Sequence, residues 1–138
     1  MGDGINRTRI VAIIDDDLLD HFIYKHSLRT ACPTSQVLYF LSATEAINYF
    51  IENAGFEDKL PDVVMFDLRM PHIDGWLYLE MFGKLKSTLS KKRIYHYACT
   101  CSLNREDINY ISPNLHGYYI KPILTKNFRD MLDRDQCN

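Results

Sequence analysis

Acidic side chains directly follow two short apolar runs of this chain. Asp15, Asp16 and Asp17 come after Arg9–Ile14, and Asp67 comes after Val63–Phe66. Crowded carboxylates repel one another unless a cation intervenes. Mg²⁺ prefers oxygen ligands and is commonly held by one or two carboxylates together with a phosphate oxygen. A carboxylate can also act as a nucleophile and form an aspartyl phosphate, so this pattern indicates metal-assisted phosphoryl chemistry.

A hydroxyl and an amine stand at the ends of two further apolar runs. Thr100 follows Ile94–Cys99, and Lys121 follows Gly117–Ile120. Charge on a transferred phosphoryl group is stabilised by metal ions, ammonium groups and hydroxyl donors. Mg²⁺, Lys121 and Thr100 could fill these three roles.

Each of these residues also has a simpler interpretation when it is taken alone. Asp17 and its neighbours would favour the start of the first helix, and we expect this to be the main role of Asp17. Asp67 could cap a turn, and Asp74-Gly75 is ordinary turn chemistry. Thr100 and Lys121 could be strand-end and loop residues. The joint placement of all of them after apolar runs favours a common site.

The elements that must position these residues alternate between apolar runs and amphipathic stretches. Continuous apolar runs are typical of strands that are covered on both faces. Strand–helix alternation predicts an α/β fold with a parallel sheet, and ligands of such sheets lie beyond the carboxyl ends of the strands. We expect strands at Arg9–Ile14, Val37–Phe40, Val63–Phe66, Ile94–Cys99 and Gly117–Ile120, and helices at Leu18–Thr30, after Ser42-Ala43-Thr44-Glu45, at Trp76–Leu89, at Arg105–Ile111 and from Thr125.

Composition excludes several other classes of protein. The chain has 138 residues, 46% hydrophobic and 25% charged, which suits one globular domain. We expect this domain at 9–133, with tails at 1–8 and 134–138. A net charge of −2 gives no sign of nucleic-acid binding. No signal peptide or membrane span is recognisable, so a cytoplasmic location is expected. The four cysteines lack zinc-ligand spacing.

Four motifs carry a resemblance to a known family: IIDDD, FDLRMPHIDG, ACTCS and GYYIKPI. In order and approximate spacing they resemble the receiver domain of two-component response regulators, over Arg9–Leu132. The resemblance implies a doubly wound, flavodoxin-like sheet of five parallel strands in the order 2-1-3-4-5, with five helices on both faces. It also implies a stand-alone receiver similar to chemotaxis regulators, because only a helix and a short tail follow Lys121.

The resemblance implies the phosphoacceptor and the metal ligands. Asp67 would accept a phosphoryl group from a sensor histidine kinase or a histidine phosphotransfer protein. Asp15 and Asp16 would hold Mg²⁺ together with Asp67 and the backbone carbonyl of Arg69. Such a domain is a signalling phosphoprotein rather than an enzyme, with only self-catalysed phosphorylation and dephosphorylation.

The resemblance also implies a switch. Thr100 would bond the phosphoryl oxygens, Lys121 would pair with the carboxylate and then with the phosphoryl group, and Tyr118 would be the switch aromatic. Arg69 and Ser102 could modulate the lifetime of the phosphoryl group, although Arg69 could equally be a surface bystander. The fourth helix, fifth strand and fifth helix would form the output face for a target protein that the sequence does not identify.

Two rival functions and two unusual segments remain open at this point. A phosphohydrolase with an aspartyl-phosphate intermediate would resemble haloacid dehalogenases, which place a second acid where this chain has Arg69. A non-phosphorylated interaction module would keep the fold without binding Mg²⁺. His96 is either a satisfied core histidine or part of a partner surface. Lys84–Lys92 looks like a long, mobile loop, in which the basic run that continues to Arg93 would be solvated.

Overall fold

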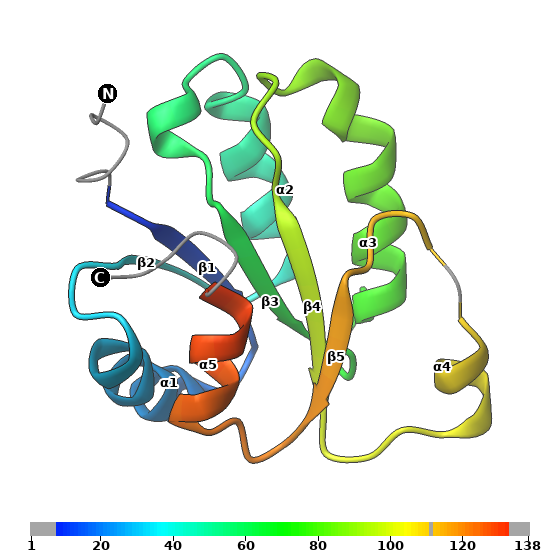
Figure 1. Ribbon diagram of the computed structural model, residues 1–138. Helices are drawn as coiled ribbons and strands as arrows, with labels where there is room; N and C mark the ends of the chain where they lie inside the picture. The colour runs from blue at the N-terminus through cyan, green and yellow to red at the C-terminus, as the bar shows by residue number, and fades with distance from the viewer. Residues whose placement is uncertain (1–7, 111, 133–138) are drawn as a thin grey trace.

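The computed structural model describes residues 8–110 and 112–132 (Figure 1). The predicted tails therefore lie outside the described residues, apart from Thr8. Along the described chain, strands and helices alternate as predicted. No helix in this part of the chain is long and apolar enough to cross a membrane.

The predicted five-stranded parallel sheet is confirmed, in the order β2-β1-β3-β4-β5. All five strands begin and end within one residue of the predicted runs. β1, β3 and β4 are almost wholly buried, as expected for strands that are covered on both faces. The strands are β1 at Ile10–Ile14, β2 at Gln36–Phe40, β3 at Val63–Asp67, β4 at Tyr95–Thr100 and β5 at Gly117–Ile120.

Helices α1 to α4 start where side-chain caps satisfy their first amides. The Asp17 carboxylate accepts from the amide of Leu19, and the Ser42 hydroxyl accepts from that of Glu45. The Glu45 carboxylate bonds the amide of Leu41, one residue before the position that an ideal capping box would use. The helices are α1 at Leu18–Ala31, α2 at Ala43–Glu52, α3 at Gly75–Leu85, α4 at Arg105–Asn109 and α5 at Thr125–Leu132.

Two hydrophobic cores lie on the two faces of the sheet. α1 and α5 cover one face, and α2 and α3 cover the other (Figure 1). Alternation along β3 sends Val63 and Met65 toward α1 and α5, and sends Val64 and Phe66 toward α2 and α3. Asp67 is the last residue of β3 and lies at the carboxyl edge of the sheet, between these two cores.

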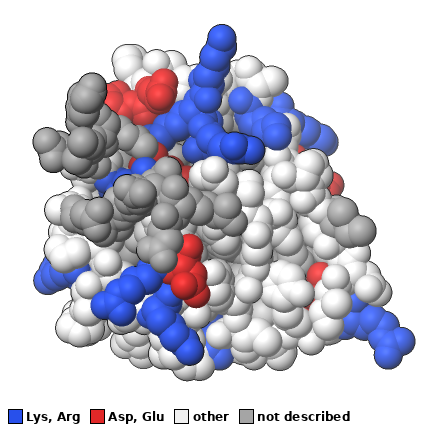
Figure 2. Space-filling view, viewed as in Figure 1, with Lys and Arg blue, Asp and Glu red and all other residues white. Residues whose placement is uncertain are grey.

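The segment before β4 is more ordered than predicted. α3 ends at Leu85, and a 3₁₀ turn at Lys86–Thr88 replaces part of the expected loop. Figure 2 shows Lys and Arg side chains gathered over this end of the molecule. The expectation of a fully solvated basic run is wrong for Lys92, whose buried ammonium lies 3.3 Å from an Asp62 oxygen and also bonds the carbonyl of Leu60.

Candidate functional site

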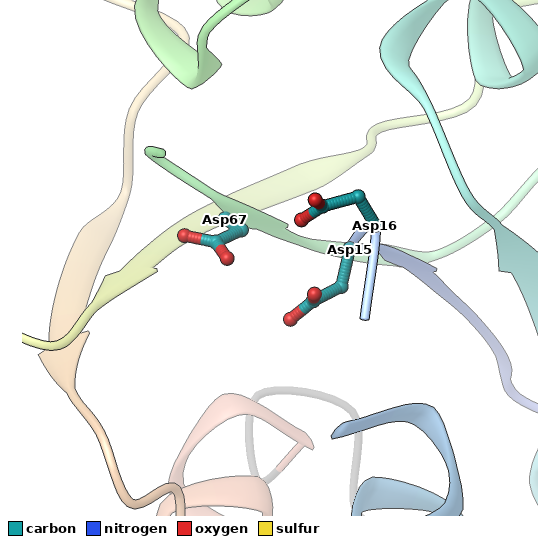
Figure 3. A group of neighbouring side chains, drawn as sticks. All are labelled: Asp15, Asp16 and Asp67. Atoms are coloured by element: carbon teal, nitrogen blue, oxygen red, sulfur yellow. The ribbon is translucent and has the colours of Figure 1, made fainter. Parts of the chain in front are cut away.

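Three carboxylates meet at the carboxyl ends of β1 and β3. Asp15 and Asp16 follow β1, and Asp67 ends β3 (Figure 3). One oxygen of each lies within 4.8 Å of the others. Asp15 is 1% exposed and Asp67 6% exposed, whereas Asp16 faces solvent. These are hard oxygen donors without nitrogen or sulfur, so the group fits Mg²⁺ better than a softer metal.

The surroundings of the Asp15 carboxyl disfavour its charged form. Burial raises the pKa of Asp15 to about 7, the amide of Asp17 and the charge of Lys121 oppose that shift, and Asp67 adds to it. Burial is thus a larger cause than the crowding of carboxylates that the sequence suggested. A cation beside Asp15 would favour its charged form.

Lys121 joins this group from the end of β5. Its ammonium lies 3.0 Å from an Asp67 oxygen and 3.3 Å from an Asp15 oxygen. Its side chain is 14% exposed, and its amide donates to the carbonyl of Thr100. Burial opposes the charge on Lys121, but hydrogen bonds to Asp20 and Asp67 outweigh it and raise the pKa of this ammonium above its ordinary value. The structure therefore brings the predicted amine directly onto the predicted nucleophile.

The other three predicted switch or modulating residues lie on or just after β4 and β5, and none of them bonds Asp67 among the described residues. The buried Thr100 hydroxyl donates to the carbonyl of Ser102 at 3.0 Å. Ser102 is exposed. Tyr118 is 46% exposed on β5, paired in register with Ala98 of β4.

Arg69 takes part in the site through its backbone and points its side chain elsewhere. Its amide donates to Asp67 Oδ1 at 3.0 Å. Its guanidinium forms an ion pair with Asp107 of α4. The same carboxylate accepts from Trp76 Nε1 at 2.9 Å, and the Trp76 ring stacks on Tyr110 at 4.0 Å. Burial tends to raise the pKa of Asp107, but the bonds from Arg69, Asn104 and Trp76 hold it below its ordinary value. Arg69 therefore links the segment that follows Asp67 to α4.

Gly75 lets α3 start against the backbone of Asp67. A Cβ at this position would lie 2.8 Å from the carbonyl oxygen of Asp67 and 2.8 Å from the Cα of Leu68. The Gly75 amide also donates to the Leu68 carbonyl. The glycine in DLRMPHIDG thus serves close packing beside the candidate nucleophile, and not only turn chemistry.

A fourth carboxylate, which the sequence analysis missed, completes the site. Asp20 in the first turn of α1 lies 2.9 Å from Lys121 Nζ. Asp16, Asp20, Asp67 and Lys121 line an open pocket of about 550 Å³, with Cys101 at its edge. The available signal was the spacing of Asp20 three residues after the helix cap, but an acid there also fits the helix dipole.

Comparisons with known proteins bear on the fold of this chain. No protein-family model matches the chain. The probable methanogenesis regulatory protein FilR2 of Methanothrix harundinacea is 23% identical over 123 residues, which cover 88% of this chain and 76% of that protein.

Solved structures give the stronger similarity. A two-component response regulator from Cytophaga hutchinsonii has a TM-score of 0.82 at 21% identity, covering 94% of this chain and 98% of that one. A response regulator receiver protein from Dyadobacter fermentans has a TM-score of 0.76 at 26% identity, covering 93% and 98%. The chemotaxis protein CheY4 of Vibrio cholerae has a TM-score of 0.68 at 18% identity, covering 94% and 99%. The chain has the fold of response regulator receiver domains, as the motifs predicted.

Proposed function

We propose that this protein is a response regulator that accepts a phosphoryl group on Asp67. The observation that carries the proposal is the ammonium of Lys121 at 3.0 Å from an Asp67 oxygen. Asp67 in turn belongs to a group of three carboxylates whose oxygens lie within 4.8 Å of one another. The donor would be a phosphohistidine of a sensor histidine kinase or of a phosphotransfer protein, in the cytoplasm. An Asp67 oxygen attacks phosphorus, the P–N bond breaks, and the imidazole nitrogen leaves with its electron pair.

Mg²⁺ would be held by Asp15, Asp16 and Asp67, with the backbone carbonyl of Arg69 as a further oxygen ligand. When bound, the ion neutralises negative charge on the phosphoryl oxygens. Lys121 stabilises the same charge from the side of β5. Hydrolysis by water then returns inorganic phosphate and the free Asp67 carboxylate.

The output would arise from competition for hydrogen bonds at the ends of β4 and β5. The Thr100 hydroxyl, which bonds the Ser102 carbonyl, would turn to the phosphoryl oxygens, and the exposed Tyr118 ring would follow it. This shift would bias the surface of α4, β5 and α5 toward a target protein. The Arg69–Asp107 ion pair supports the proposal, because it connects the segment that follows Asp67 to that surface.

Phosphorylation by a small phosphodonor tests the proposal. The wild-type protein, incubated with phosphoramidate and Mg²⁺, should gain one base-labile phosphoryl group that hydroxylamine removes, seen as a mass increase of the intact protein. Asp67→Asn should abolish the gain. Asp74→Asn is the matched control, because Asp74 lies in the same loop as the exposed cap of α3 and Asn also caps helices. A phosphoryl group that persists on Asp67→Asn would contradict the assignment.

A further inference from the structure

Asp20 makes the shortest of the three bonds to the ammonium of Lys121. The distance from Nζ is 2.9 Å to Asp20, 3.0 Å to Asp67 and 3.3 Å to Asp15. Asp20 reaches the ammonium from α1, and its side chain is 23% exposed.

Asp20 differs from the other two acceptors in its relation to the metal site. Its carboxylate is not part of the group formed by Asp15, Asp16 and Asp67. A divalent ion in that group would occupy oxygens of Asp15 and Asp67 and would repel the ammonium. The bond to Asp20 is the one that the ion would leave free. Lys121 keeps its backbone position in either case, because its amide is bonded to Thr100.

We propose that Asp20 is a positioning residue that draws the charge of Lys121 away from Asp67 and adds negative charge to the metal site. This inference rests on the proposed function. The added charge strengthens binding of a divalent cation. The same charge repels an incoming anionic phosphodonor and competes with the phosphoryl group for the ammonium. Asp20 therefore raises metal affinity and slows phosphoryl uptake.

Asp20→Asn separates these two effects. The amide has the shape of the carboxylate, and its oxygen can still accept from Lys121, so the variant loses charge with little change in packing. For a partly exposed charge, we expect Mg²⁺ affinity, measured by titration calorimetry, to fall roughly fivefold. At saturating Mg²⁺, the rate of phosphorylation by phosphoramidate should rise roughly fivefold. Damage to the site by a purely structural change would lower both quantities.

Two further variants serve as controls. Asp17→Asn removes a neighbouring exposed charge that caps α1 without bonding Lys121, and it should change both quantities by less than about twofold. Asp20→Glu restores the charge and should bring Mg²⁺ affinity back to within about twofold of wild type. Equal effects of Asp17→Asn and Asp20→Asn would overturn the inference, as would slower or unchanged phosphorylation of Asp20→Asn.

The outcome also separates this inference from the proposed function. If the wild-type protein takes up no phosphoryl group on Asp67, the proposed function fails and the kinetic part of the inference fails with it. The Mg²⁺ titration still tests the electrostatic part. Unchanged Mg²⁺ affinity in Asp20→Asn would overturn it even if Asp67 is phosphorylated.

Discussion

The buried pair of His96 and Tyr78 should make the free energy of unfolding depend on pH. His96 is fully buried in β4, and its Nε2 lies 2.8 Å from the hydroxyl of Tyr78. Burial, with a smaller contribution from His116, lowers the pKa of His96 to about 3. His96 is therefore a neutral core residue at physiological pH, and the partner-surface alternative is wrong.

The sign and size of the effect follow from proton linkage. In the unfolded chain, His96 takes up a proton near its ordinary pKa of about 6.5, whereas in the native state it does so only near pH 3. Between these values the unfolded state binds more protons, so stability falls as the pH falls. Lowering the pH from about 7 to about 5 should remove about 2 kcal/mol through this residue alone.

A double variant isolates this contribution. Tyr78→Phe combined with His96→Phe removes both polar partners together, which avoids leaving one of them unpaired in the core. Any packing cost of replacing the His96 imidazole by the larger phenyl ring is the same at every pH. The free energy of unfolding, from urea titrations at pH 7, 6 and 5, should lose about 2 kcal/mol less in the double variant than in wild type. Tyr78→Phe alone should keep the pH dependence and lose about 1–3 kcal/mol throughout, because the buried Nε2 of His96 then loses its partner.

Wild type must be compared with the double variant because protonation of Asp15 changes the free energy of unfolding in the opposite direction to that of His96. Burial raises the pKa of Asp15 to about 7, so acidification below that value favours the native state. Asp15 is present in wild type and in the double variant, and its contribution cancels in the difference. Parallel pH profiles of the two proteins would refute the reasoning about His96.

Two other predictions concern residues that pack against the segment after Asp67, namely Gly75 at the start of α3 and Asp107 in α4. Gly75→Ala should lower the free energy of unfolding by about 1–3 kcal/mol, because the added Cβ meets backbone atoms 2.8 Å away that cannot rotate aside. Gly55→Ala, with nothing within 4 Å of its Cβ, should show no such loss in the same urea titration. Asp107→Asn keeps a helix-capping side chain but replaces the ion pair to Arg69 by at most a neutral hydrogen bond. The amides of α4 should therefore exchange hydrogen faster, while those of α5 stay unchanged. Unaltered exchange in α4 would show that Arg69 does not tether it.

The sheet could be predicted from the sequence because its signal is local. Val63–Phe66 is continuously apolar, and a strand covered on both faces requires such a run. The candidate site followed from the same logic, since residues after parallel strands share one edge. The end of α3 at Leu85 was harder to predict from the sequence. The apolar pattern continues to Leu89, which is buried without being helical.

The partners of Asp20 and Arg69 could not be read from their neighbours. Asp20 lies in the first turn of a helix, where an acid is favourable for local reasons, and its ion-pair partner is 101 residues away. Arg69 was compatible with the pocket or with the surface, and its partner Asp107 is 38 residues away. In both cases the local sequence is compatible with the residue type, while tertiary packing decides which opposite charge the side chain pairs with.

The register of the paired strands decides whether these residues meet in one site. β4 and β5 pair in parallel with Thr100 opposite Ile120, and this register lets the amide of Lys121 bond the carbonyl of Thr100. A slip of one residue would send every side chain of β5 to the other face and would move the Lys121 ammonium away from Asp67. The connection between these strands runs through α4, so no short turn fixes their register. Its anchors are packing contacts of β5, such as the Tyr119 ring at 5.9 Å from that of Tyr97, and these depend on the whole fold.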